Sequence, residues 1–236
     1  MATAGTGTRK AQGERTHAAI LESAVHIASA EGLEGLTIGR LAAELEMSKS
    51  GLFAHFGSKE ELQLATIDAA RSIFIRDVMR PAMEVPAGIA RLWKLCDTWL
   101  GHVEAEVFRG GCFFAAVAAE FDSRPGPVRD RIADIMKEWL GMLRLTIAEA
   151  QEAGHLASTA DPEQMAFEFN ALELGANWSM QLHGYSQAFT RARDAILQRL
   201  QTCATTKGAS LLPRGNKLAA KKRLKRIKGK PCAGDP

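Results

Sequence analysis

Residues 37–63 read TIGRLAAELEMSKSGLFAHFGSKEELQ, and this segment carries the strongest structural signal in the chain. Thr37, Ser48 and Ser58 each stand directly before a run of residues with helical character, the position that N-capping hydroxyls prefer. Ser58 is followed three residues later by Glu61, which completes a capping box. The segment therefore predicts two short helices and the beginning of a longer third helix, joined by tight turns.

The apolar residues of this segment predict how the two short helices pack. Leu41 and Leu45 lie on one face of the first short helix, and Leu52 and Phe56 lie at i and i+4 on the second. If these faces meet, the polar beginning of the second helix stays outside, where the major groove of a duplex can receive it.

An upstream helix completes a three-helix unit. Between about residues 16 and 30, Ile20, Ala24 and Ile27 recur at helical spacing, and Gly32 closes the run. Three short helices with a tight turn between the second and third match the helix-turn-helix layout, in which the last helix reads DNA.

The same residues resemble a known family. The core SKSGLFAHFGSKEEL and its flanks, over roughly residues 16–64, look like the signature of the tetracycline-repressor (TetR) family of transcriptional regulators. The resemblance implies a dimeric repressor whose helical body binds a small ligand. It also implies a set of DNA-contacting residues: Thr37, Arg40, Ser48, Lys49, Ser50, Gly51, Phe53, His55 and Lys59.

Several of these residues also have a purely structural interpretation. Ser48 and Ser58 are caps whether or not they also contact phosphates. Gly51 either allows close approach of the backbone to DNA or marks a tolerant position. Phe53 stands where the family often has Tyr, so it either contacts DNA without that hydroxyl or packs against the first helix. Lys49 is the strongest candidate for a DNA contact.

The rest of the chain also reads as helix. The fourth helix is expected to run to about Met79, with Pro81 beyond its end. Apolar periodicity between Gly and Pro punctuation predicts five further helices, at about 87–107, 112–122, 127–152, 162–183 and 186–204. The chain is therefore expected to be all-α, with a DNA-binding head and a helical body.

Bulky residues in this body are candidates for a ligand cavity with a few polar anchors, such as Asn170. The alternative is an ordinary helical core, which is where such residues usually lie. Cys112 could sense oxidants or simply pack. The candidate lining residues are Trp93, Cys96, Trp99, His102, Cys112, Phe114, Trp139, Phe169 and Trp178.

Charge divides the chain unequally. From residue 207 onward there are ten Lys and Arg against one acid, although the whole chain carries only +3. This tail either attracts DNA non-specifically or keeps the protein in solution. We expect a flexible arm at 1–13, a DNA-binding unit at 14–64, a regulatory and dimerisation unit at 65–206, and a disordered basic tail at 207–236.

Other classes of protein fit the sequence less well. No catalytic constellation, metal-ligand spacing or cofactor motif stands out, so we expect no enzyme, metal or cofactor. The four scattered cysteines and the polar N-terminus favour a cytoplasmic protein that is not bound to membranes. Two alternatives stay open: an architectural nucleic-acid binder acting through its tail, and a small helical enzyme with a structural helix-turn-helix.

The function predicted from the sequence is that of a ligand-responsive repressor. The family resemblance implies a homodimer paired through 162–183 and 186–204, although a monomer could pack these helices internally; the dimer would bind a palindromic operator with two recognition helices on one face of the DNA. A small lipophilic effector would favour a spacing of these helices that no longer fits two successive grooves.

Overall fold

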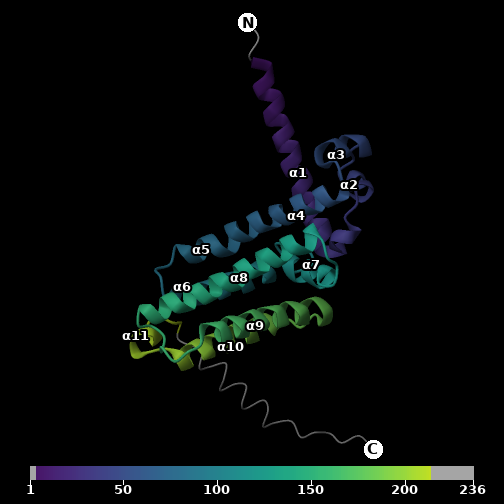
Figure 1. The fold of residues 1–236 in the computed structure, drawn as a ribbon. Coiled ribbons are helices and arrows are strands. Elements are labelled where there is room, and N and C mark those ends of the chain that lie inside the picture. Colours follow the sequence, from purple (N-terminus) through teal and green to yellow (C-terminus); the bar gives the residue numbers. More distant parts are fainter. Residues whose placement is uncertain (1–3, 214–236) are drawn as a thin grey trace, which may run out of the picture.

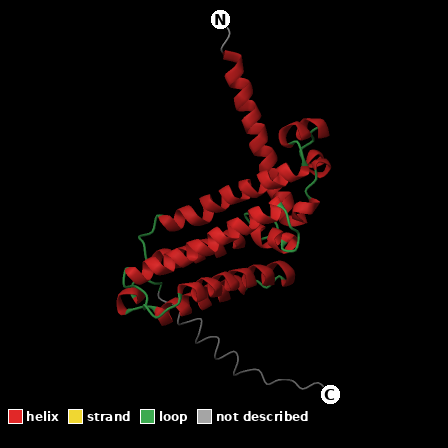
Figure 2. Ribbon diagram, viewed as in Figure 1, coloured by secondary structure: helices red, strands yellow, loops and turns green. Residues whose placement is uncertain are grey.

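The computed structural model describes residues 4–213 of the chain, and within that range every regular element is helical. The only strand-like pairing there is a single antiparallel bridge between Leu156 and Ala204. Figures 1 and 2 show a small group of helices at one end of the molecule and a stack of longer helices below it. The all-α class expected from the sequence is confirmed.

The head contains three helices and the beginning of a fourth, with bounds α1 (Ala4–Gly35), α2 (Ile38–Glu44), α3 (Lys49–Phe56) and α4 (Lys59–Phe74). The three predicted caps are present. The hydroxyl oxygens of Thr37, Ser48 and Ser58 each accept a hydrogen bond from the backbone N–H three residues later, at 3.0 to 3.1 Å. These bonds satisfy donors that a helix leaves free at its N-terminus.

Helix α1 is longer than the sequence analysis expected. It begins at Ala4, so residues 4–13 continue the helix and do not form a separate arm. The physical reason is that each residue added to an existing helix forms one further hydrogen bond, and the run Arg9–Gln12 consists of good helix formers. Gly32, where the sequence predicts the end of this helix, leaves helical geometry with a φ of 79° and kinks α1, and one further turn continues to Gly35.

The helix after the head also runs past its predicted end. α4 passes through a π-helical turn (Ile75–Met79) into α5 (Arg80–Met83), so Pro81 lies within continuous helical structure. Proline lacks the N–H that would bond to the carbonyl four residues earlier. The wider π-helical turn changes the bonding pattern just before Pro81, which lets the helix continue.

The body consists of long helices stacked side by side below α4 and α5 (Figure 1). They follow the five predicted ranges closely: α6 (Ile89–Glu104), α7 (Phe113–Phe121), α8 (Pro127–Glu152), α9 (Pro162–His183) and α10 (Ala188–Cys203). α9 and α10 form the outermost layer, on the side of α8 away from α4.

The predicted basic tail begins later than residue 207. A short helix, α11 (Thr206–Ala209), follows α10, and its cap Thr205 donates a hydrogen bond to the carbonyl of Gly154 at 2.7 Å. Leu212 is buried as well. These apolar and capping contacts anchor residues 206–213 to the turn after α8, and residues 214–236 lie outside the described part of the chain. Between residues 4 and 213, no helix is both long and apolar enough to cross a membrane.

Candidate nucleic-acid interface and ligand cavity

Helix α3 has one buried edge and one open edge. Leu52 and Phe56 lie in the core, as predicted. Lys49, Ser50 and Phe53 are exposed, and 54% of the surface of Phe53 is accessible. Phe53 therefore does not pack into the core against α1. We call the exposed set Lys49, Ser50, Phe53 and Ala54 the recognition edge; no described part of the chain covers it.

The turn before α3 sets the direction of this helix. Glu46 adopts a left-handed backbone with a φ of 53°, which is uncommon for a residue with a side chain. The N–H of Met47 bonds to the carbonyl of Ala42 at 3.0 Å. These features turn the chain sharply between α2 and α3 and bring Ser48 to the N-terminus of α3.

The charged candidates differ in how they are paired. Arg40 forms ion pairs with Glu31 and Glu44, both at 2.9 Å, and these carboxylates raise its pKa. Lys59 pairs with Glu34 at 2.9 Å, which lowers the pKa of that carboxyl. A DNA phosphate would have to compete with these acids.

Lys49 has no ion-pair partner among residues 4–213. A Cβ placed at Gly39 would lie 3.5 Å from Cε of Lys49, so the stem of this lysine rests on α2 while its ammonium group is exposed. Lys49 is thus free to meet a phosphate or a base edge without breaking an internal pair.

The cap of α3 explains why position 51 is a glycine. A Cβ at this position would lie 3.0 Å from the capping hydroxyl of Ser48. That oxygen accepts the hydrogen bond of the Gly51 N–H, so a larger residue would press on the cap. His55 is half-buried, and its ring lies 5.9 Å from the ring of His17 on α1.

The head is joined to the body through α7. Glu120 accepts hydrogen bonds from the backbone N–H groups of Leu33 and Glu34, at 2.7 and 2.8 Å, in the last turn of α1, just after Gly32. At the other end of α7, a Cβ added to Gly110 would lie only 1.8 Å from the carbonyl oxygen of Ser29. α7 therefore contacts α1 at both ends.

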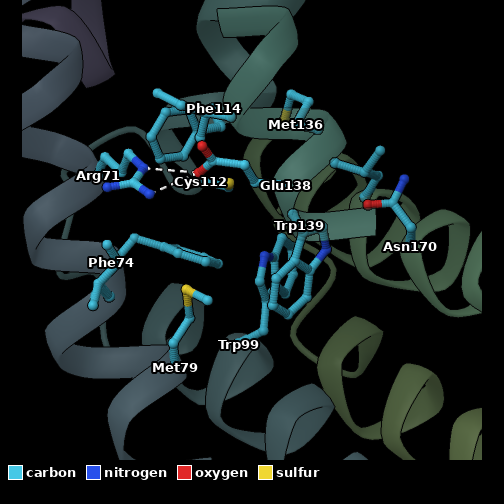
Figure 3. A pocket seen from close by; sticks show the side chains of 13 residues that line it. Arg71, Phe74, Met79, Trp99, Cys112, Phe114, Met136, Glu138, Trp139 and Asn170 are labelled. Atoms are coloured by element: carbon cyan, nitrogen blue, oxygen red, sulfur yellow. Dashed lines mark hydrogen bonds and ion pairs between the residues drawn. The ribbon is translucent and has the colours of Figure 1, made fainter. Parts of the chain in front are cut away.

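A cavity of about 30 Å³ lies in the body where α4, the π-helical turn, α6, α7, α8 and α9 meet (Figure 3). Its edge carries an ion pair between Arg71 and Glu138 at 2.8 Å. The lining residues are Arg71, Phe74, Ile75, Met79, Trp99, Cys112, Phe114, Ile135, Met136, Glu138, Trp139, Asn170 and Leu174.

Four of the predicted lining residues, Trp99, Cys112, Phe114 and Trp139, line this cavity, as does Asn170. The other five predicted lining residues do not line this cavity. Cys96, His102 and Phe169 are buried elsewhere in the core, Trp93 is half-buried, and Trp178 is 58% exposed on α9.

Sequence reasoning missed the wall that comes from α4 and the π-helical turn. Arg71, Phe74, Ile75 and Met79 line the cavity, spaced as neighbours on one helix face. This spacing is the signal in the sequence from which the wall could be predicted.

Large apolar side chains are exposed on the outer layer of the body. Phe167 and Leu182 on α9 are 67% and 64% exposed, and Trp178 lies between them in sequence. Beside them, a groove between α9 and α10 is lined mainly by small residues, including Gly175, Ala176 and Ala192. An exposed apolar surface of this kind is typical of a protein interface.

Comparisons with known proteins agree with this geometry. The profile described as "Bacterial regulatory proteins, tetR family" matches residues 20–66, and "Tetracyclin repressor-like, C-terminal domain" matches residues 88–196. The HTH-type transcriptional regulator TcmR of Streptomyces glaucescens is 27% identical over 205 residues, which cover 83% of this chain and 89% of that protein.

Solved structures share the fold. A TetR transcriptional regulator from Chloroflexus aurantiacus superposes with a TM-score of 0.75 at 21% identity, over 82% of this chain and 98% of that chain. AibR, solved with isovaleryl coenzyme A and operator DNA, superposes with a TM-score of 0.61 at 22% identity. The match covers 79% of this chain and 97% of the AibR chain. Together with the two profile matches, these likenesses show that the chain belongs to the TetR family of DNA-binding, ligand-responsive transcriptional regulators.

Proposed function

We propose that this protein is a cytoplasmic repressor that binds a palindromic operator as a homodimer and leaves it when a small lipophilic effector enters the body. The observation that carries this proposal is the recognition edge, where Lys49 and Ser50 stand exposed at the N-terminus of α3. The proposed DNA-binding unit spans residues 14–64 and the regulatory unit spans 65–206, and the two profile matches centre on these ranges.

The residues of the head divide into two proposed roles. Lys49 and Ser50 reach base edges or adjacent phosphates, because they lie at the exposed beginning of α3. Thr37, Ser48, Lys59 and Arg40 hold phosphates on either side of the groove, where capped helix N-termini also attract anions. Gly51, Phe53 and His55 complete the surface of α3 that faces DNA.

The dimer is proposed to form through α9 and α10. Trp178, Phe167 and Leu182 of one protomer would cover the groove of small residues between α9 and α10 of its partner. A two-fold interface of this kind brings the same surface together from both subunits. It also fixes the separation of the two recognition helices, which must match successive major grooves.

The proposed effector site is the cavity at the centre of the body. With a volume of about 30 Å³ it has room for a water molecule or two, whereas ligand sites usually measure about 300 Å³ or more. Binding must therefore move a wall. α4 and α7 both line the cavity and both reach the head, α4 as a continuous helix and α7 through Glu120.

The π-helical turn Ile75–Met79 lies in this wall, and such turns often mark places where a helix bends. AibR, solved with both isovaleryl coenzyme A and operator DNA, is a structural neighbour known to bind both kinds of partner. For this chain, the movement of the wall would change the spacing of the two heads, with a coupling free energy of about 1–3 kcal/mol.

The first prediction tests the recognition edge. A Lys49→Ala, Ser50→Ala double variant is expected to lose about 100-fold or more in operator affinity, because each base contact contributes roughly 1–3 kcal/mol and a dimer loses it at two half-sites. The operator is first selected from random DNA with the wild-type protein, and affinity is then measured by fluorescence anisotropy at fixed salt.

The matched control is Lys137→Ala, which removes an exposed lysine from α8, away from the head. It should leave the operator affinity unchanged. If the double variant bound the selected operator as tightly as the control does, the proposed role of α3 would be wrong.

A further inference from the structure

The inner wall of the cavity contains buried polar groups without partners. Trp139 lines the cavity, yet its indole N–H forms no hydrogen bond. Glu173 on α9, whose carboxyl lies beside this indole but is not in the cavity lining, is completely buried, and within the described part of the chain neither of its carboxyl oxygens meets the geometry of a hydrogen bond. Asn170 and Leu174, which flank Glu173 on the same helix, also line the cavity.

The surroundings of Glu173 contain no cation. The thiol of Cys96 and the indole of Trp139 lie beside its carboxyl, although neither meets the geometry of a hydrogen bond to it, and burial raises the pKa of Glu173 well above its ordinary value. Burial therefore favours the uncharged form of this carboxyl. Buried polar groups normally find partners, and leaving them unpaired costs free energy.

A hydroxyl group fits this pair of groups because it can donate and accept at the same time. It accepts from the indole N–H of Trp139 and donates to an oxygen of Glu173. An ether cannot donate, so it leaves the acceptor oxygen of Glu173 without a partner. A hydrocarbon satisfies neither group.

The other walls favour an aromatic ring. Phe74 meets Phe114 and Trp139 edge to face, with ring centres 6.0 and 5.3 Å apart. Rings arranged in this way offer both faces and edges to a further ring. The charges of Arg71 and Glu138 at the edge of the cavity neutralise each other, so the site favours an uncharged ligand.

We infer that the effector of this protein is an uncharged aromatic compound with a hydroxyl group, which inserts between Trp139 and Glu173 while its ring packs against Phe74 and Phe114. This inference rests on the proposed function, in which the cavity is the effector site. It adds the chemical class of the ligand and the two residues that distinguish a hydroxyl group from other substituents.

The test compares naphthol with its methyl ether and with naphthalene, by calorimetric titration of the full-length protein at neutral pH. Wild-type protein is expected to bind naphthol about 30-fold more tightly than naphthalene, with the ether between them, since two hydrogen bonds distinguish the extremes. In Trp139→Phe and Glu173→Leu, the ratio should fall to about fivefold, because each variant removes one of the two partners that together give about 30-fold. Trp93→Phe, which changes a half-buried tryptophan outside the cavity, should keep the full ratio.

The variants also distinguish the loss of a hydrogen bond from a loss of folding. Glu173→Leu replaces an unpaired buried carboxyl with an apolar side chain of similar size, which is often neutral or stabilising, so its melting temperature should be equal to or above that of the wild type. Should Glu173→Leu fail to fold, Trp139→Phe alone decides the question, because it keeps the ring and loses only the N–H.

The outcomes separate the inference from the proposed function. A wild-type protein that binds none of the three probes, or binds them equally well, overturns the inference. So does a naphthol preference that persists undiminished in both cavity variants. A clear preference that falls to about fivefold in each variant supports it, even if naphthol does not release the operator; in that case only the proposed link between the cavity and DNA binding would be wrong.

Discussion

A Trp178→Glu variant is expected to be monomeric and to bind the operator about 10² to 10⁴ times more weakly than the wild type, since each head would bind without the effective concentration that the second head provides. Trp178 is 58% exposed on α9, between Phe167 and Leu182, which are exposed even more. In the proposed dimer this ring is covered by the partner. A carboxylate placed there would be buried without a cation, which a protein interface tolerates poorly.

Sedimentation velocity gives the mass of the variant, and anisotropy gives its affinity for the selected operator. The matched control is Met83→Glu, which places the same charge at an exposed apolar residue of α5, across the body from α9 (Figure 1). The control should remain dimeric. A Trp178→Glu protein that sediments as a dimer and binds DNA normally would show that the subunits pair through another surface.

The head could be predicted from the sequence because its signals are local. Thr37, Ser48 and Ser58 cap helices through bonds to residues three positions away, so each start can be read from a short stretch of chain. Leu52 and Phe56 are buried as their spacing indicated. The exposure of Lys49 then follows, because it lies on the opposite side of a very short helix.

The cavity could be predicted only in part because it depends on which helices meet. Trp139 and Trp178 are the same residue type in helices of similar character, yet one lines the cavity and the other faces outward. No local pattern distinguishes them. The ion pair of Arg71 with Glu138 joins residues 67 positions apart, and the sequence alone gives no indication of this pairing.

The two ends of the described chain show the same division between local and long-range signals. The small, polar character of residues 1–13 predicts a flexible arm, but the adjoining helix extends through residues 4–13. The scarcity of large apolar groups after residue 206 predicts that the tail begins at residue 207, but the described chain stays packed as far as residue 213. The placement of residues 206–213 depends on the turn after α8, where Gly208 packs against the backbone of His155.

A Gly110→Ala variant is expected to lower the free energy of unfolding by about 3 kcal/mol, the upper range for overpacking a well-packed site. A Cβ at this position would lie 1.8 Å from the carbonyl oxygen of Ser29 and 2.6 Å from its carbon, both in the backbone of α1. Backbone atoms in a helix cannot move aside as the end of a flexible side chain can. The loop before α7 would therefore have to withdraw from α1.

The consequence should reach the DNA-binding head. α7 and its N-cap Cys112 contribute Cys112 and Phe114 to the cavity, and Glu120 of α7 bonds to the last turn of α1, so displacing the beginning of α7 disturbs both contacts. Urea denaturation measures the stability, and anisotropy measures operator affinity. Gly141→Ala is the matched control, because its new Cβ in α8 has no atom nearer than 4.0 Å and should add up to about 1 kcal/mol of helix stability. Equal stability of the two variants would mean that α7 is not seated on α1, and α4 would then be the only connection between the cavity and the head.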